Sequence, residues 1–523
     1  MGSSSSCCEK SGRLDAAAET VAAPKAAEKE KEPECCHKAT EMDVAPMWSA
    51  DLEGLQLDHL KVHSDLVRGI SLANALGSRR LWHTSPADLT LSEREGLWGR
   101  SAKVESFDLF FSHTWRTWGG WKVLTLSFHF GWKWMLVLWL LAVGISGLLS
   151  AAGLLPAPIS YTPGEILSFQ ANADFFPWIF LSIACIMALS FAALPYILAV
   201  SPKPTMCFLD VVSIHQTDDH MMRKGIYGLG GFLSVAKELH VLWSTPYLSR
   251  LWCIFELAAF RKANPSGVIV LNPLFTAIQT AIWMVVFFVA TGIYICCLLL
   301  SQGALPLVGI VSLLLLPSFH STRKHMRERH ALISQLKNFD VQSAGCRLEK
   351  DREFILSAIQ SWYGSLDAFN EHVRGPLREE LLKDSKTELP LGYALLVSSA
   401  PSAVPLDIFT VLVRAGAPAE VVLCQLFVCM VHVFWLALVL NVAWRLCARF
   451  AARSWKGLDY VVTMLIYGVV VLCYILGLAA VRRARSRSLL ATLACAVASL
   501  SLALAVYGKC RCRAARLDAA LEA

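Results

Sequence analysis

Charged residues are scarce in this chain. They make up 17% of its 523 residues, whereas a typical soluble domain has about 25%, and hydrophobic residues make up 55%. The mean hydropathy is +0.48. A composition this poor in charge excludes a purely soluble globular protein, because its long apolar segments require lipid around them. The net charge of +7 is spread over the loops, so the composition predicts no nucleic-acid partner.

Three other common features are missing. The N-terminus has no basic start followed by an apolar stretch, so we expect no cleaved signal peptide. Many of the 17 cysteines lie in apolar runs, where cysteine acts as a small hydrophobe, so a disulfide framework is not expected. Cys35, Cys36 and His37 lack the paired spacing of zinc ligands. The sequence therefore predicts neither a metal site nor a required cofactor.

Long apolar runs predict a multi-pass membrane protein, with the lipid bilayer as its first partner. Seven runs are about as long as a bilayer-spanning helix. They lie at 132–155, 177–200, 276–300, 304–319, 421–444, 458–481 and 488–508. A further stretch at 391–413 is interrupted by Pro401, Pro405 and Asp407. Seven and eight crossings therefore both stay open.

Basic residues orient these spans. The segment 323–329 has the sequence RKHMRER and is typical of a cytosolic loop under the positive-inside rule. If 391–413 crosses, the basic stretches 445–456 and 509–516 also lie inside, which favours eight crossings. The segments that this orientation places in the cytosol are 1–130, 201–275 and 320–388.

Short apolar runs in the cytosolic segments predict an α/β domain. The runs typical of buried parallel strands are 107–112, 206–210, 239–243 and 267–271. The stretch 224–238 between two of them has a helical apolar stripe, and alternating strands and helices predict a parallel sheet. Ligands of such sheets bind outside the carboxyl ends of the strands. Those ends lie at 112–115, 210–219 and 244–247.

The predicted fold class is thus α/β plus membrane α-helical, with a small parallel-sheet domain built from discontinuous segments and seven or eight spans. A further helix at 349–374 is amphipathic, with core packing, the membrane surface or an oligomer interface as its alternatives. The expected segments are a disordered tail (1–46), a cytosolic segment with the first strand (47–130), a transmembrane hairpin (131–200), the main α/β segment (201–275), a second hairpin (276–319), a cytosolic helical segment (320–388), a transmembrane bundle (389–508) and a tail (509–523).

One motif follows the third predicted strand. Residues 244–257, STPYLSRLWCIFEL, predict a turn and then a helix that carries a carboxylate. Trp252, Cys253 and Glu256 stand three and four positions apart, so they share one helical face. A carboxylate held beside the carboxyl end of a strand is a candidate functional group.

These residues resemble the Toll/interleukin-1 receptor (TIR) domain, a flavodoxin-like signalling module. Residues 107–112 resemble its opening strand, and 244–257 resemble the plant-type pattern S-x-x-Y-x-x-S-x-W-C-L-x-E-L. Residues 210–218 resemble a stretch of the related heterokaryon-incompatibility domains. There are two departures: Arg250 stands where the plant pattern has serine, and two membrane spans replace the first soluble helix.

The resemblance implies signalling by self-association of the cytosolic domain as a homo-oligomer, through a loop at 211–222 that contacts a neighbouring subunit. In enzymatic members the motif glutamate cleaves the bond between nicotinamide and ribose in NAD, which implies a catalytic role for Glu256 and NAD as substrate. The residues that the resemblance places around the nucleotide are Ser112, His113, Trp115, Ser244 and Trp252.

Two other functions also fit the sequence. Glu256 is also a candidate salt-bridge partner of Arg250 or Arg261, which would favour a non-enzymatic scaffold. A transporter or channel would use polar groups within the spans, where Asp407, Asn441 and His432 are the candidates.

The N-terminus matches a lipidation pattern. Gly2 lies in a myristoylation motif, and Cys7 and Cys8 are potential palmitoylation sites. Two acyl chains would hold this tail at the bilayer. The alternative is a flexible serine-rich start.

Overall fold

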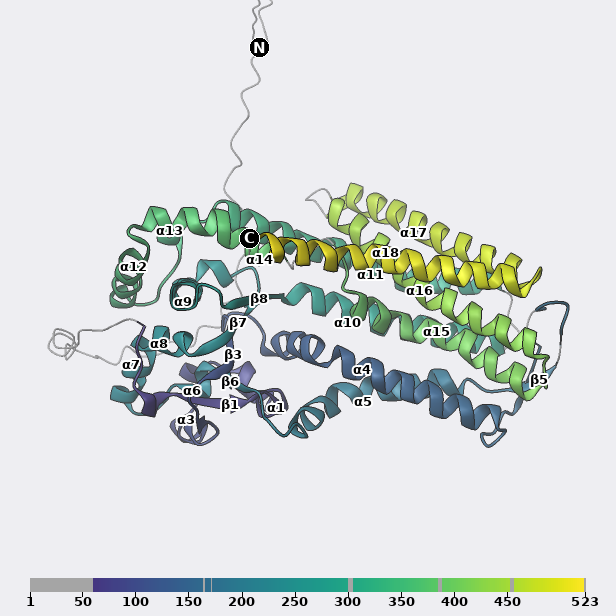
Figure 1. Cartoon of the computed structure of the whole chain (residues 1–523), viewed down its shortest axis with the longest axis horizontal. Helices are drawn as coiled ribbons and strands as arrows, with labels where there is room; N and C mark the ends of the chain where they lie inside the picture. The colour runs from purple at the N-terminus through teal and green to yellow at the C-terminus, as the bar shows by residue number, and fades with distance from the viewer. Residues whose placement is uncertain are drawn as a thin grey trace, which may run out of the picture. The chain divides into compact units, whose positions relative to one another are not determined.

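The computed structural model describes residues 60–162, 165–170, 172–299, 304–383, 388–451 and 456–521 (Figure 1). From residue 60 onward these belong to one compact unit. The predicted N-terminal tail, with Gly2, Cys7 and Cys8, lies outside the described residues.

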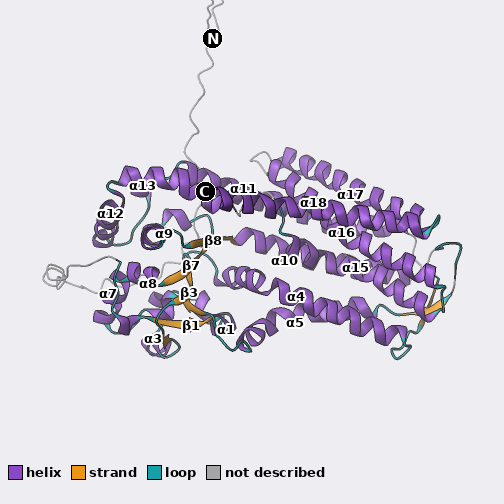
Figure 2. Ribbon diagram, in the orientation of Figure 1, coloured by secondary structure: helices purple, strands orange, loops and turns teal. Residues whose placement is uncertain are grey.

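A six-stranded sheet forms the centre of the α/β domain (Figure 2). All four predicted strands are present, but two further strands make the sheet mixed, because β1 pairs antiparallel with both β2 and β6. The spatial order is β2-β1-β6-β3-β7-β8. The strands are β1 (Arg68–Ser71), β2 (Ala102–Lys103), β3 (Phe107–Ser112), β6 (Met206–Phe208), β7 (Ala236–Trp243) and β8 (Val268–Pro273).

The four parallel strands follow the flavodoxin-like order. β3 pairs parallel with β6 on one side and with β7 on the other, and β7 pairs parallel with β8. In chain order the sheet therefore runs second, first, third, fourth. In such sheets the connections reverse direction between the first and third strands, which are β3 and β7 here, and this switch point is where ligands bind.

The first helix of the domain is also the first membrane helix. α4 (Gly119–Ala151) follows β3 without a soluble crossover, and its first turns pack against the sheet. Val123 and Leu126 share a core cluster with Phe111 of β3. The approach of α4 to α2 (Arg80–His83) requires glycine at its start, because a Cβ on Gly119 would lie 2.0 Å from the carbonyl oxygen of Trp82.

A second group of helices covers the opposite face of the sheet. The core there joins β3 and β7 to α8 (Leu229–Ser234) and α9 (Leu251–Ala263). Two helices of the 320–388 segment, α12 (Glu349–Tyr363) and α13 (Leu366–His372), pack into the same core. The buried side chains that they contribute are Ile355, Ala358, Ile359 and Phe369.

Two predicted helices are interrupted. The helix predicted at 349–374 is divided at Gly364, whose φ of +84° ends α12 in a conformation that glycine adopts without strain. The helix predicted at 224–238 is divided at Gly228 between α7 (Asp219–Tyr227) and α8 (Leu229–Ser234), and it ends at Ser234 because Ala236 pairs with Phe107 and starts β7. Strand pairing therefore overrides the helical pattern of the last residues.

Seven of the described helices are long and apolar enough to cross a membrane. They include α15 at the interrupted stretch 391–413, which supports a crossing there. The predicted span at 304–319 lies in the first half of α11 (Ala304–Lys337). The structure does not describe the side chains of 304–310, so this span remains a prediction. The seven helices are α4 (Gly119–Ala151), α5 (Trp178–Ala199), α10 (Leu274–Leu299), α15 (Leu391–Arg414), α16 (Ala419–Arg449), α17 (Lys456–Arg485) and α18 (Leu489–Leu521).

α11 joins the membrane helices to the α/β domain. Leu332 and Leu336 in its second half are buried in the core of the domain. Nearer its middle, the buried Arg323 guanidinium bonds the Asp459 carboxylate of α17 at 3.0 Å. The Arg323 Nε also donates to the carbonyl oxygen of Phe450, the residue after α16, at 2.6 Å. The end of α16 and the start of α17 therefore lie at the same end of the helices as the sheet, as expected if 391–413 crosses.

The remaining described elements are short. They are α1 (Leu72–Gly77), α3 (Leu91–Trp98), α6 (Asp210–Ser213), α7 (Asp219–Tyr227), α14 (Arg378–Lys383), a hairpin of β4 (Ile159–Tyr161) and β5 (Ala173–Phe175), and the single turns Ser64–Leu66, Pro86–Asp88, Tyr247–Ser249, Val341–Ser343 and Val373–Leu377.

Candidate functional site

Glu256 lies at the switch point of the sheet. Its carboxylate bonds the hydroxyl of Ser112, the last residue of β3, and that hydroxyl also contacts the phenol of Tyr247. Ser112 and Tyr247 are both buried. The start of α9 and the end of β3 thus bring together residues that are 144 positions apart in the chain.

Burial makes Glu256 a weak acid. Loss of solvation raises the pKa of Glu256 from its ordinary 4.5 to about 8, and the nearby Asp210 adds to this, while the Ser112 hydroxyl works against it. The carboxyl group is therefore mostly protonated at neutral pH. A carboxyl group with a pKa near 8 can take up or release a proton under physiological conditions, which is typical of acid–base sites.

Cys253 lies one helical turn before Glu256 and faces the same strand end. Its Sγ lies 3.6 Å from the carbonyl oxygen of His113. Burial raises the pKa of the Cys253 thiol well above its ordinary value. It is therefore a neutral packing group rather than a nucleophile.

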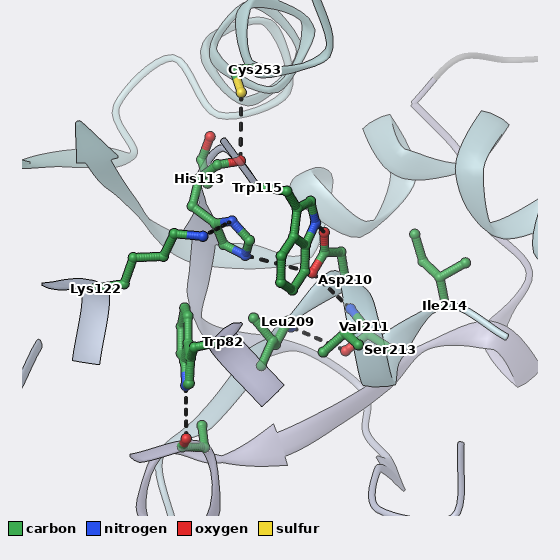
Figure 3. Close-up of polar contacts among 12 residues, drawn as sticks. Trp82, His113, Trp115, Lys122, Leu209, Asp210, Val211, Ser213, Ile214 and Cys253 are labelled. Atoms are coloured by element: carbon green, nitrogen blue, oxygen red, sulfur yellow. Dashed lines mark hydrogen bonds and ion pairs between the residues drawn. The ribbon is translucent and has the colours of Figure 1, made fainter. Parts of the chain in front are cut away.

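A second buried polar cluster adjoins the first (Figure 3). The His113 ring lies between the Lys122 ammonium, 3.2 Å from Nδ1, and the Asp210 carboxylate, 3.6 Å from Nε2. Asp210 also accepts the Trp115 indole N–H at 2.9 Å. Burial, assisted by the Lys122 charge, lowers the pKa of His113. The neutral ring thus separates a cation from a carboxylate.

The remaining residues predicted to surround the nucleotide contact other side chains than Glu256. The Ser244 hydroxyl contacts the Thr117 hydroxyl at 2.6 Å. The Trp115 ring faces the Lys122 ammonium, with 4.8 Å from Nζ to the ring centroid. Trp252 faces away from Glu256, because its indole N–H bonds Asp351 of α12 at 3.3 Å. The structure thus gathers Ser112, His113, Trp115, Ser244 and Glu256 at one edge of the sheet and places Trp252 against the covering helices.

Sequence reasoning missed Lys122 and gave Asp210 no individual role. Lys122 is 1% exposed, and the sequence carried a usable signal for it. It is a cation at the start of an apolar helix, directly after a strand that ends in polar residues. Asp210 follows its strand in the same way, and the carboxyl ends of neighbouring parallel strands meet at one edge of the sheet.

The structure also shows the contacts of residues named in the alternative interpretations, which were a salt bridge to Glu256 and polar groups within the spans. Arg261 pairs with Glu380 of α14, so this arginine is engaged away from Glu256. Asp407 accepts the backbone N–H groups of Ile179 and Phe180, at 2.9 and 3.2 Å, and so caps the first turn of α5. No cluster of three metal-ligating side chains occurs among the described residues.

The chain has no significant match among protein-family models, curated proteins or solved structures. Its function must therefore be inferred from the residues at the switch point.

Proposed function

We propose that the protein is a multi-pass membrane signalling protein whose TIR-like α/β domain faces the cytosol, self-associates and cleaves NAD. The observation that carries the proposal is the contact of Glu256 with Ser112 at the switch point of a flavodoxin-like strand order. Both segments that resemble the TIR pattern meet at this contact, although a pair of membrane helices separates them in the chain.

Glu256 would act on the ribose. In the reaction, the bond between nicotinamide and ribose C1′ breaks, nicotinamide leaves with the electron pair, and water supplies the new oxygen and releases a proton. The ribose gains oxocarbenium character, which an ionised carboxylate stabilises. Because the pKa of Glu256 is about 8, the ionised form becomes abundant only in mildly alkaline solution. The positive nicotinamide ring would favour ionisation further.

The second buried cluster would support this chemistry from one side. His113 and Asp210 follow the carboxyl ends of β3 and β6, and Lys122 lies in the first turn of α4. The membrane helix α4 would therefore contribute directly to the edge where the nucleotide would lie. A shift of α4 would move Lys122 and, through it, His113. This arrangement supports coupling between the membrane helices and the site.

A non-enzymatic scaffold is the second candidate, and one observation favours it. The polar groups of the site already bind one another: Ser112 engages Glu256, and Asp210 engages Trp115. A substrate would have to displace the Ser112 contact. In a scaffold these bonds would simply hold β3, α9 and α6 together.

Nicotinamide release by the full chain in nanodiscs distinguishes the two candidates. Wild type, Glu256→Gln and Glu371→Gln should be compared at low and high protein density. Glu371 is exposed on α13 and serves as the matched control. We expect turnover that rises with density and is lost only in Glu256→Gln. Equal rates in all three proteins, or no turnover at any density, would contradict NAD cleavage, and turnover that ignores density would contradict the need for self-association.

A further inference from the structure

A cavity of about 590 Å³ lies where the α/β domain meets the first membrane hairpin. Its walls come from α1, from α2 with the residue before it, from the first turns of α4 and from the last turns of α5. α1 contacts both helices. The cavity is separate from the Glu256 site, because neither Ser112 nor Glu256 lines it.

The turns of α4 that line this cavity lie at the level of lipid headgroups. The two helices run antiparallel, with the rings of Phe128 and Phe191 5.3 Å apart. Counting about 20 residues for the hydrocarbon core back from the far end of α4 at Ala151 reaches Gly131. The turns of α4 that line the cavity, 120–127, lie directly beyond that point, on the side of the sheet.

The lining is divided between polar and apolar groups. Toward α1 it carries the cation Arg79, the ring of His83 and the polar side chains of Asn74 and Ser78. The residues that line it include no carboxylate. Along α4 and α5 the lining is mostly apolar, with Val123, Leu124, Phe191, Ala192 and Pro195, and Ser127 is a polar residue among them.

Two aromatic residues border the cavity. Trp118 is 56% exposed and Tyr196 is 77% exposed, which is unusual for such large side chains in a folded domain. Aromatic rings with a polar edge are enriched where membrane proteins meet the headgroups. The Trp118 ring also packs edge-on against His83, with 5.4 Å between the centroids. This contact holds the imidazole beside the opening.

We propose that this cavity binds an anionic glycerophospholipid. Arg79 would contact the phosphate, with Asn74 and Ser78 as further hydrogen-bond donors, and an acyl chain would lie along Phe191, Ala192 and Pro195 of α5. A bound lipid would link α1 to the membrane hairpin that carries Lys122 into the candidate site. The lipid site depends only on the cavity and its lining, so it stands whether or not the protein cleaves NAD.

Native mass spectrometry of the full chain in detergent tests the assignment. The probes are dioleoylphosphatidylglycerol, dioleoylphosphatidylcholine and inorganic phosphate. The variants are Arg79→Gln, Ala192→Trp, which fills the apolar side, and Arg80→Gln as the matched control. Arg80 is exposed in the same short segment but does not line the cavity.

We expect phosphatidylglycerol to bind wild type and Arg80→Gln equally. Arg79→Gln should weaken it by about tenfold, which corresponds to the loss of one charge-assisted hydrogen bond. Ala192→Trp should weaken it as well, while the melting temperatures of all variants stay close to wild type. Equal binding by all variants, equal binding of phosphatidylcholine, or full displacement by inorganic phosphate would each overturn the assignment, the last by indicating a site for the free anion.

Discussion

Replacing Glu256 by glutamine should remove a pH dependence from the stability of the α/β domain. Native Glu256 has a pKa of about 8 against an ordinary value of 4.5, so the folded state holds its proton where the unfolded state has lost it. Wild-type stability should therefore fall as pH rises from 4.5 to 8. The full difference in pKa corresponds to roughly 5 kcal/mol, which is an upper value because Glu256 retains some solvent contact.

The assay is thermal unfolding of wild type and Glu256→Gln in detergent between pH 5 and 9, with Glu371→Gln as the control. Other groups titrate in both proteins, so the difference between the two melting temperatures isolates Glu256. We expect the melting temperature of Glu256→Gln, relative to that of wild type, to be several degrees higher at pH 9 than at pH 5. Each kcal/mol of stability corresponds to about 2–4 °C in domains of this size. A difference that stays constant across the range would refute the raised pKa of Glu256.

Three further predictions follow from the contacts. In the proposed reaction Glu256 acts in its ionised form, so kcat/KM for NAD should rise with pH through about 8, and a rate that is flat or falls there would contradict the proposed role. Gly119→Ala places a methyl group 2.0 Å from the Trp82 carbonyl oxygen and should cost about 1–3 kcal/mol or more in thermal unfolding, whereas Gly96→Ala, with open space around it, should not destabilise. Arg323→Ala should lower the free energy of unfolding by about 3–5 kcal/mol, because it leaves Asp459 buried without its cation. The double variant Arg323→Met/Asp459→Leu should recover much of that stability in the same thermal unfolding assay. A double variant as unstable as the single one would argue against an ion pair between these residues.

The strands could be predicted because they are short apolar runs that end in polar residues. The run at 107–112 became β3 over the same residues, and the run at 267–271 became β8, which starts one residue later and ends two residues later than predicted. β1 and β2 were not predicted. They are only four and two residues long, and their place is set by pairing with β6 and with each other, which no local pattern contains.

The site was predictable in part. The spacing of Cys253 and Glu256 correctly placed both on the face of α9 that meets β3. Trp252 stands four positions before Glu256, which also predicts the shared face, but its indole N–H bonds Asp351 of α12 instead. Lys122 was missed although its place is visible in the sequence: it lies at the start of an apolar helix, directly after the strand that became β3.

The central claim is that the edge of the sheet between Ser112 and Glu256 accepts a nucleotide. A structure of the full chain in nanodiscs with a non-hydrolysable NAD analogue tests it most directly. We predict that the contact between Ser112 and Glu256 opens and that the ribose of the analogue lies beside the Glu256 carboxylate. An intact contact, with no analogue bound at the ends of β3 and β7 at saturating concentration, would contradict the claim.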